Sequence, residues 1–252
     1  MNKRLLIGLF IFVALSLSAM IFILKPKNST EFSSEDVASY VKNLDQNSLL
    51  TKEDIKKAKI KASGKSLNED TYKNVIPDHY MGNKNSKVTV IEYEDFACSH
   101  CQAMHIYFDK IQQDYKDRVT FIFRNSSLGY PNSIATLSAA EAAGKLGGEE
   151  AFWKMHKLLF KDQRWVGQAV DIKLKRQLFT DYAKESGLNA QEFLATLNNA
   201  KVNGIEEKIE RDHKLAEKSG VTGTPTWFVN GKKVEKANDK EIRKAIEKAL
   251  NK

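Results

Sequence analysis

The sequence predicts an α/β fold in which a β-α-β unit is separated from a β-hairpin and a last helix by a long helical insertion. Three observations predict this order. Two segments of β-forming residues, 87–94 and 119–124, flank a helical segment that begins near two cysteines. The stretch 127–219 repeats apolar residues at helical spacing and contains no clear strand. Asn230-Gly231 then marks a tight hairpin turn, and the chain ends in an amphipathic segment.

Residues 1–24 are expected to form a membrane anchor. Lys3 and Arg4 precede the uncharged run 5–24, which would make a helix of about 30 Å, long enough to cross the apolar core of a bilayer. A cleaved secretory signal is the alternative, because Ser16-Leu17-Ser18 offers a small-x-small site. The apolar run continues beyond that site, so we favour the anchor. Either interpretation exports the rest of the chain.

Residues 25–72 are expected to form a polar stalk with one or two short helices. Thr51 followed by Asp54 has the pattern of a helix N-cap, so 53–62 could be helical. The apolar residues of this stretch are too few for an independent core. The folded domain would therefore cover 73–252, with its helical insertion at about 127–219.

Cys98 and Cys101 are the only cysteines of the chain and follow directly on the first predicted strand. They lie about one helical turn apart, so both sulfurs can share one side of the helix. A helix start presents free N–H groups and the positive end of the peptide dipole, which favour a thiolate. The thiolate is the reactive form in disulfide exchange. The pattern therefore predicts a redox-active Cys98–Cys101 pair that needs no other cofactor.

Three other interpretations of the cysteines are weaker. They could be buried structural thiols, although C-x-x-C spacing straight after a strand is unusual for those. They could bind zinc together with His100 and His105, but a structural zinc site normally takes its second pair of ligands from elsewhere in the chain. They could form a structural disulfide, but so short a loop constrains the unfolded chain very little. We therefore expect no metal.

Glu92 is unusual in an otherwise apolar strand. It is either an edge residue that faces solvent or a partly buried carboxylate near the thiols, able to shuttle protons during exchange. Within the insertion, Trp153, His156 and Trp165 have the spacing of packing residues rather than of a cofactor site. The net charge of +8 is spread along lysine-rich helical segments without a basic patch, so nucleic-acid binding is not expected.

The order of these elements resembles the thioredoxin superfamily, and the helical insertion resembles its DsbA-like thiol:disulfide oxidoreductases. Cys98-Ser99-His100-Cys101 matches the active-site tetrad of that family, although the best-known oxidases have proline at the place of Ser99. Gly223-Thr224-Pro225-Thr226 matches the loop whose proline is cis and lies against the thiols. Glu92, six residues before Cys98, falls where such enzymes keep an acid beneath the active site. The anchor and stalk resemble those of Gram-positive-type members.

The resemblance implies a role for each residue of the site. Cys98 would be the exposed nucleophile and Cys101 the more buried resolving thiol. His100 would stabilise the Cys98 thiolate. Thr224 and Pro225, with Ser99, would contact the substrate.

The resemblance also implies partners and a location. The protein would introduce disulfides into exported proteins that carry free thiols. It would be a single-pass protein of the cell membrane, held in lipid by 5–24, with its catalytic domain on the extracytoplasmic side. A quinone-linked membrane protein, DsbB-like or vitamin-K-epoxide-reductase-like, would reoxidise it. A disulfide reductase or isomerase of the same fold, or a tethered chaperone or binding module, are the alternatives.

Overall fold

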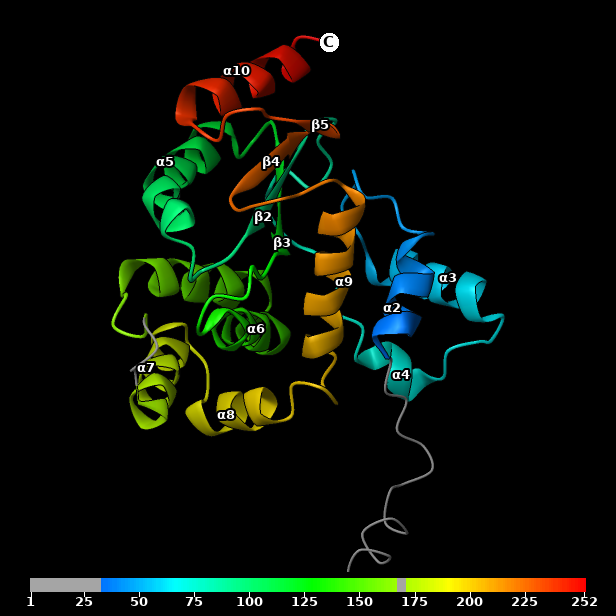
Figure 1. Ribbon diagram of the computed structural model, residues 1–252, viewed down its shortest axis with the longest axis vertical. Helices are drawn as coiled ribbons and strands as arrows, with labels where there is room; N and C mark the ends of the chain where they lie inside the picture. The colour runs from blue at the N-terminus through cyan, green and yellow to red at the C-terminus, as the bar shows by residue number, and fades with distance from the viewer. Residues whose placement is uncertain (1–32, 167–170) are drawn as a thin grey trace, which may run out of the picture. The chain divides into compact units, whose positions relative to one another are not determined.

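The computed structural model describes residues 33–166 and 171–252, which belong to one compact unit (Figure 1). The expected anchor, 1–24, lies outside the described residues. In the described ranges, no helix combines the length and the apolar character needed to cross a membrane.

A five-stranded sheet with the order β1-β3-β2-β4-β5 forms the centre of this unit. Its strands are β1 (His79–Gly82), β2 (Thr89–Glu94), β3 (Thr120–Asn125), β4 (Thr226–Val229) and β5 (Lys232–Lys233). The predicted β-α-β unit is confirmed, because β2 and β3 pair in parallel. The predicted hairpin is also confirmed: Asn230 and Gly231 adopt φ values of 45° and 73° between the antiparallel strands β4 and β5. Strand β1 was not predicted, since it is short and shows no alternating pattern.

Helices cover both faces of the sheet (Figure 1). They are α2 (Ser34–Val41), α3 (Lys52–Ser63), α4 (Glu69–Lys73), α5 (Ser99–Tyr115), α6 (Ser133–Lys161), α7 (Ile172–Glu185), α8 (Ala190–Asn198), α9 (Ile205–Lys218) and α10 (Asp239–Leu250). The expected insertion corresponds to α6–α9, and α6 changes to non-helical φ/ψ at Gly148.

The alternation of side chains along β2 decides what each face buries. Val90 belongs to the larger hydrophobic core, which is built mainly with α5–α8 and α10. Ile91 and Tyr93 belong to a second core, shared with α2, α3 and the end of α9. Glu92 and Glu94 therefore point to the same side of the sheet as Val90, the side on which the cysteine helix α5 packs.

The stalk prediction was wrong for the part of 25–72 that contains α2 and α3. The buried Tyr40 and Ile55, from these two helices, share the second core with Ile91 of β2. The expected N-cap is present, because Thr51 and Asp54 form a capping box at the start of α3. These helices are indeed too poor in apolar residues to form a core alone, but the sheet supplies the other half of it.

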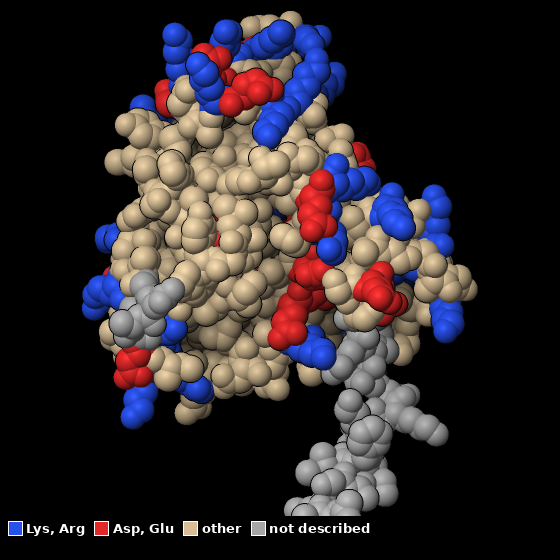
Figure 2. Space-filling view, viewed as in Figure 1, with Lys and Arg blue, Asp and Glu red and all other residues tan. Residues whose placement is uncertain are grey.

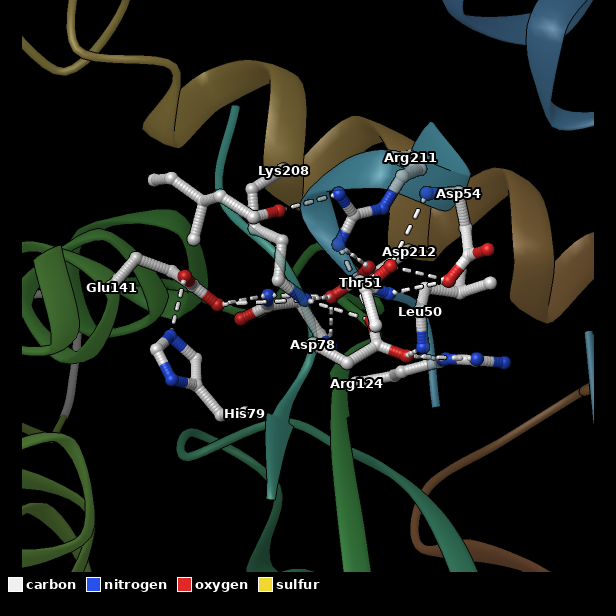
Figure 3. Close-up of polar contacts among 12 residues, drawn as sticks. Leu50, Thr51, Asp54, Asp78, His79, Arg124, Glu141, Lys208, Arg211 and Asp212 are labelled. Carbon is white, nitrogen blue, oxygen red and sulfur yellow. Dashed lines mark hydrogen bonds and ion pairs between the residues drawn. The ribbon is translucent and has the colours of Figure 1, made fainter. Parts of the chain in front are cut away.

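Buried charged groups connect this N-terminal part to the sheet and to α9 (Figure 3). We call the group the ionic cluster; its members are Asp78, His79, Arg124, Glu141, Lys208, Arg211 and Asp212, whose side chains are at most 4% exposed. Arg124 lies 2.9 Å from Asp78 and also donates to the carbonyl oxygens of Gln46 and Ser48. Asp78 accepts the backbone N–H of Leu50 at 3.1 Å. The cluster thus fixes the connection between α2 and α3 against the sheet.

Candidate active site

Strand β2 delivers the two cysteines to the start of helix α5. Cys98 is the N-cap residue of α5, with φ −83° and ψ 120°, and its backbone N–H donates to the carbonyl oxygen of Asp95 at 3.0 Å. An N-cap side chain lies next to the first free N–H groups of its helix, where an oxygen atom usually accepts from them. Here the Cys98 sulfur occupies that place, so its thiolate can accept the N–H groups of His100 and Cys101.

These donors lower the pKa of Cys98 to about 5. The largest contribution is a hydrogen bond from the Cys101 thiol; contact with Thr224 and the two backbone N–H groups add to it, while burial opposes the shift. The pKa of Cys101 moves the opposite way and lies well above its usual value, because burial disfavours its thiolate and its thiol donates to Cys98. The site therefore holds one thiolate and one thiol at neutral pH.

Cys98 is less exposed than the resemblance implied. It is 3% exposed, against 0% for Cys101, and both are free thiols. The reason is the loop before β4: the Thr224–Pro225 peptide bond is cis, and the carbonyl oxygen of Thr224 lies 3.3 Å from the Cys98 sulfur. The expected cis bond at Pro225 and the expected contact of Thr224 with the thiols are thus present. The adjoining Ser99 and His100 are exposed at the surface.

The predicted role for the ring of His100 stays a prediction. The contribution of His100 to the Cys98 pKa comes from its backbone N–H. His105, considered above as a zinc ligand, stacks on Phe160 with ring centroids 4.7 Å apart. Among residues 33–166 and 171–252, no three His, Cys, Asp or Glu side chains are grouped so that they could hold a metal ion.

Sequence reasoning missed Asp95, which ties the next loop of the chain to the cysteine motif. Its carboxylate accepts the N–H of Ala97 at 2.9 Å, the N–H of Leu128 at 3.2 Å and the hydroxyl of Ser133 at 2.7 Å. The 126–133 loop is thereby held against the turn that precedes Cys98. An acidic residue three positions before the first cysteine was the available signal.

Glu92 is fully buried rather than at a solvent-facing edge, and sequence reasoning missed a second buried carboxyl, Glu94; each is 1% exposed. Burial, and then the charge of Glu94, hold the pKa of Glu92 well above its usual range. Burial also raises the pKa of Glu94 to about 8. The charge of the Glu94 carboxyl is among the causes that raise the pKa of Cys101. Two acids at alternate positions of one buried strand were the signal for this pair.

Thr224 offers a direct test of how the Cys98 thiolate is stabilised. Its hydroxyl oxygen is buried without a hydrogen-bond partner in the described residues, so it is available to the thiolate. We expect Thr224→Val to raise the Cys98 pKa by about one unit, since hydrogen bonds to charged groups contribute about 1.5–3 kcal/mol. Thiolate absorbance against pH measures this. Thr226→Val is the control: it removes the hydroxyl bonded to the Gly223 carbonyl oxygen at 2.6 Å and should leave that pKa in place.

A strand-linked cysteine pair at a helix start, faced by a cis-proline loop on a mixed sheet, defines the thioredoxin-fold class of dithiol–disulfide proteins. Residues 73–248 match the family model described as thioredoxin. The chain belongs to that family, within its DsbA-like thiol-disulfide oxidoreductases.

Relatives and solved structures agree with this membership. Disulfide bond formation protein D of Bacillus subtilis is 30% identical over 180 residues, which cover 68% of this chain and 76% of that protein. A putative protein-disulfide oxidoreductase of Rickettsia prowazekii is 31% identical and covers 72% of this chain and 64% of its own length. The structure of oxidised BdbD from Bacillus subtilis superposes with a TM-score of 0.62 at 28% identity, over 69% of this chain and 94% of that one.

Part of a larger protein is also similar to this chain. A Na(+)/H(+) antiporter NhaA of Herminiimonas arsenicoxydans is 29% identical over 169 residues, and the matched part spans 25% of the antiporter. The chain therefore covers only about a quarter of that relative's length.

Proposed function

We propose that this protein is an oxidase that introduces disulfide bonds into exported proteins. The observation that carries the proposal is the position of the Cys98 sulfur at the N-cap of α5, where donors hold its pKa at about 5. A thiol whose pKa lies two units below neutral pH stabilises the reduced enzyme by about 3 kcal/mol. For a two-electron couple this raises the reduction potential by about 60 mV. Such an enzyme passes its disulfide on to substrates.

The oxidising reaction starts from the Cys98–Cys101 disulfide. A substrate thiolate attacks the Cys98 sulfur, the bond between the two cysteines breaks, and its electron pair passes to the Cys101 sulfur, which takes up a proton. This leaves a mixed disulfide between Cys98 and the substrate. A second substrate thiolate attacks the substrate sulfur of that bond, and Cys98 leaves as a thiolate. The substrate loses two electrons and the enzyme gains them.

The surroundings of the site support a polypeptide substrate. The loop held by Asp95 exposes Leu128 and Tyr130, which are 40% and 44% exposed, and Ile134 follows at 53%. On α5, Ile106 is 73% exposed. Figure 2 shows a broad area between the acidic side chains along α9 and the left edge of the molecule with few charged side chains. Exposed apolar side chains near a reactive thiol suit extended, partly folded chains.

The location and partners belong to the same proposal. The uncharged run 5–24 would hold the domain at the extracytoplasmic side of the cell membrane. Exported proteins with free thiols would be the substrates. A quinone-linked reoxidase of the DsbB or vitamin-K-epoxide-reductase type would restore the Cys98–Cys101 disulfide after each turnover.

The reduction potential tests the direction of the reaction. We expect equilibration with glutathione buffers at pH 7 to give a value well above that of thioredoxin, about −270 mV. The sign of the pH dependence follows from a folded pKa of about 5 against an ordinary value of 9.0: the extra stability of the reduced form is fully present above pH 9 and is lost as the pH falls through 5. A potential near that of thioredoxin, or a Cys98 pKa near 9, would instead indicate a reductase.

A further inference from the structure

Polar side chains line one side of α5 below the thiols. His105 lies four residues after Cys101, Asp109 four residues further on, and Gln112 three residues after that. Residues at this spacing lie one above another on a helix. They are buried or half-buried, which is unusual for a row of polar groups in the interior of an α/β domain. The row leads away from Cys101 along the helix.

Strand β2 presents Glu92 and Glu94 on the same side. Glu94 is the last residue of the strand and lies nearest in sequence to the cysteines. Its Oε2 atom lies 2.9 Å from Nε2 of His156, which comes from α6, and both side chains are 1% exposed. Both carboxyl oxygens of Glu92, in contrast, lack a hydrogen-bond partner among the described residues. Glu94 is thus bonded to a helix on that side of the sheet, through His156.

The same groups continue to the surface. The rings of His105 and His156 lie 5.4 Å apart between centroids. His105 Nε2 is 3.8 Å from Asp109 Oδ2, which in turn is 3.6 Å from Nζ of Lys157. Asp109 and Lys157, with side chains 29% and 44% exposed, line a hollow of about 310 Å³ that also touches Gln112 and Met81. Polar groups thus extend from the thiols to an opening between α5, α6 and β1.

We propose that Glu94, positioned by His156, supplies the proton that Cys101 takes up when the Cys98–Cys101 disulfide opens, and that His105 and Asp109 connect Glu94 with solvent. The inference rests on the proposed oxidase reaction and adds a proton path to it. The proposed proton donor is Glu94, four residues before Cys98, rather than Glu92, six residues before it.

One turnover moves two protons. Two substrate thiols lose two protons as they become a disulfide. One proton ends on the Cys101 sulfur through Glu94, and one is released, because Cys98 remains a thiolate. The Glu94 carboxylate that is left recovers its proton from solvent along the path of His105 and Asp109. In the reverse direction, Glu94 accepts the proton of Cys101 as that thiol attacks a mixed disulfide at Cys98.

The charge environment makes Glu94 a suitable proton donor. The titratable or charged groups around it are Glu92 on β2, Asp95 in the following turn, Cys98, Cys101 and His105 on α5 and its cap, and His156 on α6, with Asp109 and Lys157 further out. Burial raises the pKa of Glu94 to about 8, so it carries a proton at pH 7. Burial lowers the pKa of His156 to about 3, so its neutral ring can accept the proton of Glu94 in a hydrogen bond.

The experiment compares Glu94→Gln with Glu92→Gln in the full chain. Reduction of the oxidised protein is followed by thiol trapping, between pH 6 and 9.5, with an aromatic thiol that is ionised throughout this range. The wild-type rate should fall above about pH 8, because Glu94 then loses its proton. The oxidised form lacks the Cys98 thiolate charge, so this fall should lie at or slightly below pH 8. Glu94→Gln should be about 10²-fold slower at pH 7 and show no such fall.

Glu92→Gln decides between the two acids. It should keep a fall in rate, because the contact of Glu94 with His156 remains. The pH of that fall should move, because the Glu92 carboxyl contributes to the pKa of Glu94. If Glu92→Gln loses the fall and Glu94→Gln keeps it, the proposal is wrong and Glu92 supplies the proton. If both variants keep it, neither acid does. The Cys98 pKa and the reduction potential of Glu94→Gln, measured in parallel, separate this outcome from a failure of the oxidase proposal, which predicts a low Cys98 pKa and a high potential whichever acid supplies the proton.

Discussion

Replacing Cys98 with alanine is expected to reduce dithiol oxidation to the uncatalysed background, whereas replacing Cys101 with alanine is expected to trap the substrate. Without the Cys98 sulfur no mixed disulfide forms, since Cys101 is 0% exposed and its pKa lies well above the usual value. Without Cys101 the mixed disulfide at Cys98 forms but lacks its internal resolving thiol. The rate at which a two-cysteine peptide is oxidised measures the first effect. Non-reducing gels of extracts, which show the trapped complexes, measure the second.

The two variants also distinguish enzyme from binding module. Ser66→Ala, in an exposed loop, is the matched control for handling and redox state. A tethered chaperone would suppress aggregation of an unfolded protein equally well with alanine at position 98. If Cys98→Ala retains the full effect of the protein on substrate folding, the thiols are incidental and the oxidase proposal is wrong.

Replacing Asp78 with alanine is expected to cost about 3–5 kcal/mol of unfolding free energy, because it leaves buried cations without their partner. Asp78 lies 2.9 Å from Arg124, 3.3 Å from Arg211 and 3.7 Å from Lys208. It also accepts the N–H of Leu50, which would lose its partner. Urea unfolding followed by circular dichroism at pH 7 measures this loss of unfolding free energy. The loss is a large part of the total, since the stability of a domain is only about 5–15 kcal/mol.

The matched control is Asp54→Ala. Asp54 is exposed and caps α3 together with Thr51, so its loss should cost about 1 kcal/mol.

The contribution of Asp78 to the unfolding free energy should also depend on pH. Burial opposes ionisation, but Arg124, Lys208 and Arg211 outweigh it and lower the pKa of Asp78 to about 2. The contribution is therefore present above pH 3.8 and is lost as the pH falls through 2. A loss for Asp78→Ala no larger than that for Asp54→Ala would mean that the cluster does not hold the N-terminal helices.

Local patterns were sufficient for most of the fold. The β-rich segment 87–94, the cysteine helix and the Asn230-Gly231 turn each depend on residues close in sequence, and each was found where expected. Strand β1 depends on pairing with β3, from Tyr80 with Ile122 for example, and its own four residues carry no pattern. The error about α2 and α3 has the same origin. Their few apolar residues become a core only against the distant Ile91 and Phe228.

The sequence by itself determined the reactive pair: Cys98 and Cys101 at a helix start specify thiol–disulfide chemistry, because spacing and peptide dipole are local properties. Only the tertiary structure decided which groups tune that pair. It brings the Thr224–Pro225 loop to the Cys98 sulfur, from more than 120 residues away, at 3.3 Å. It likewise joins Glu94 to His156 across 62 positions of the chain. Burial and through-space charge set the pKa values of these groups, and neither can be read from neighbours in sequence.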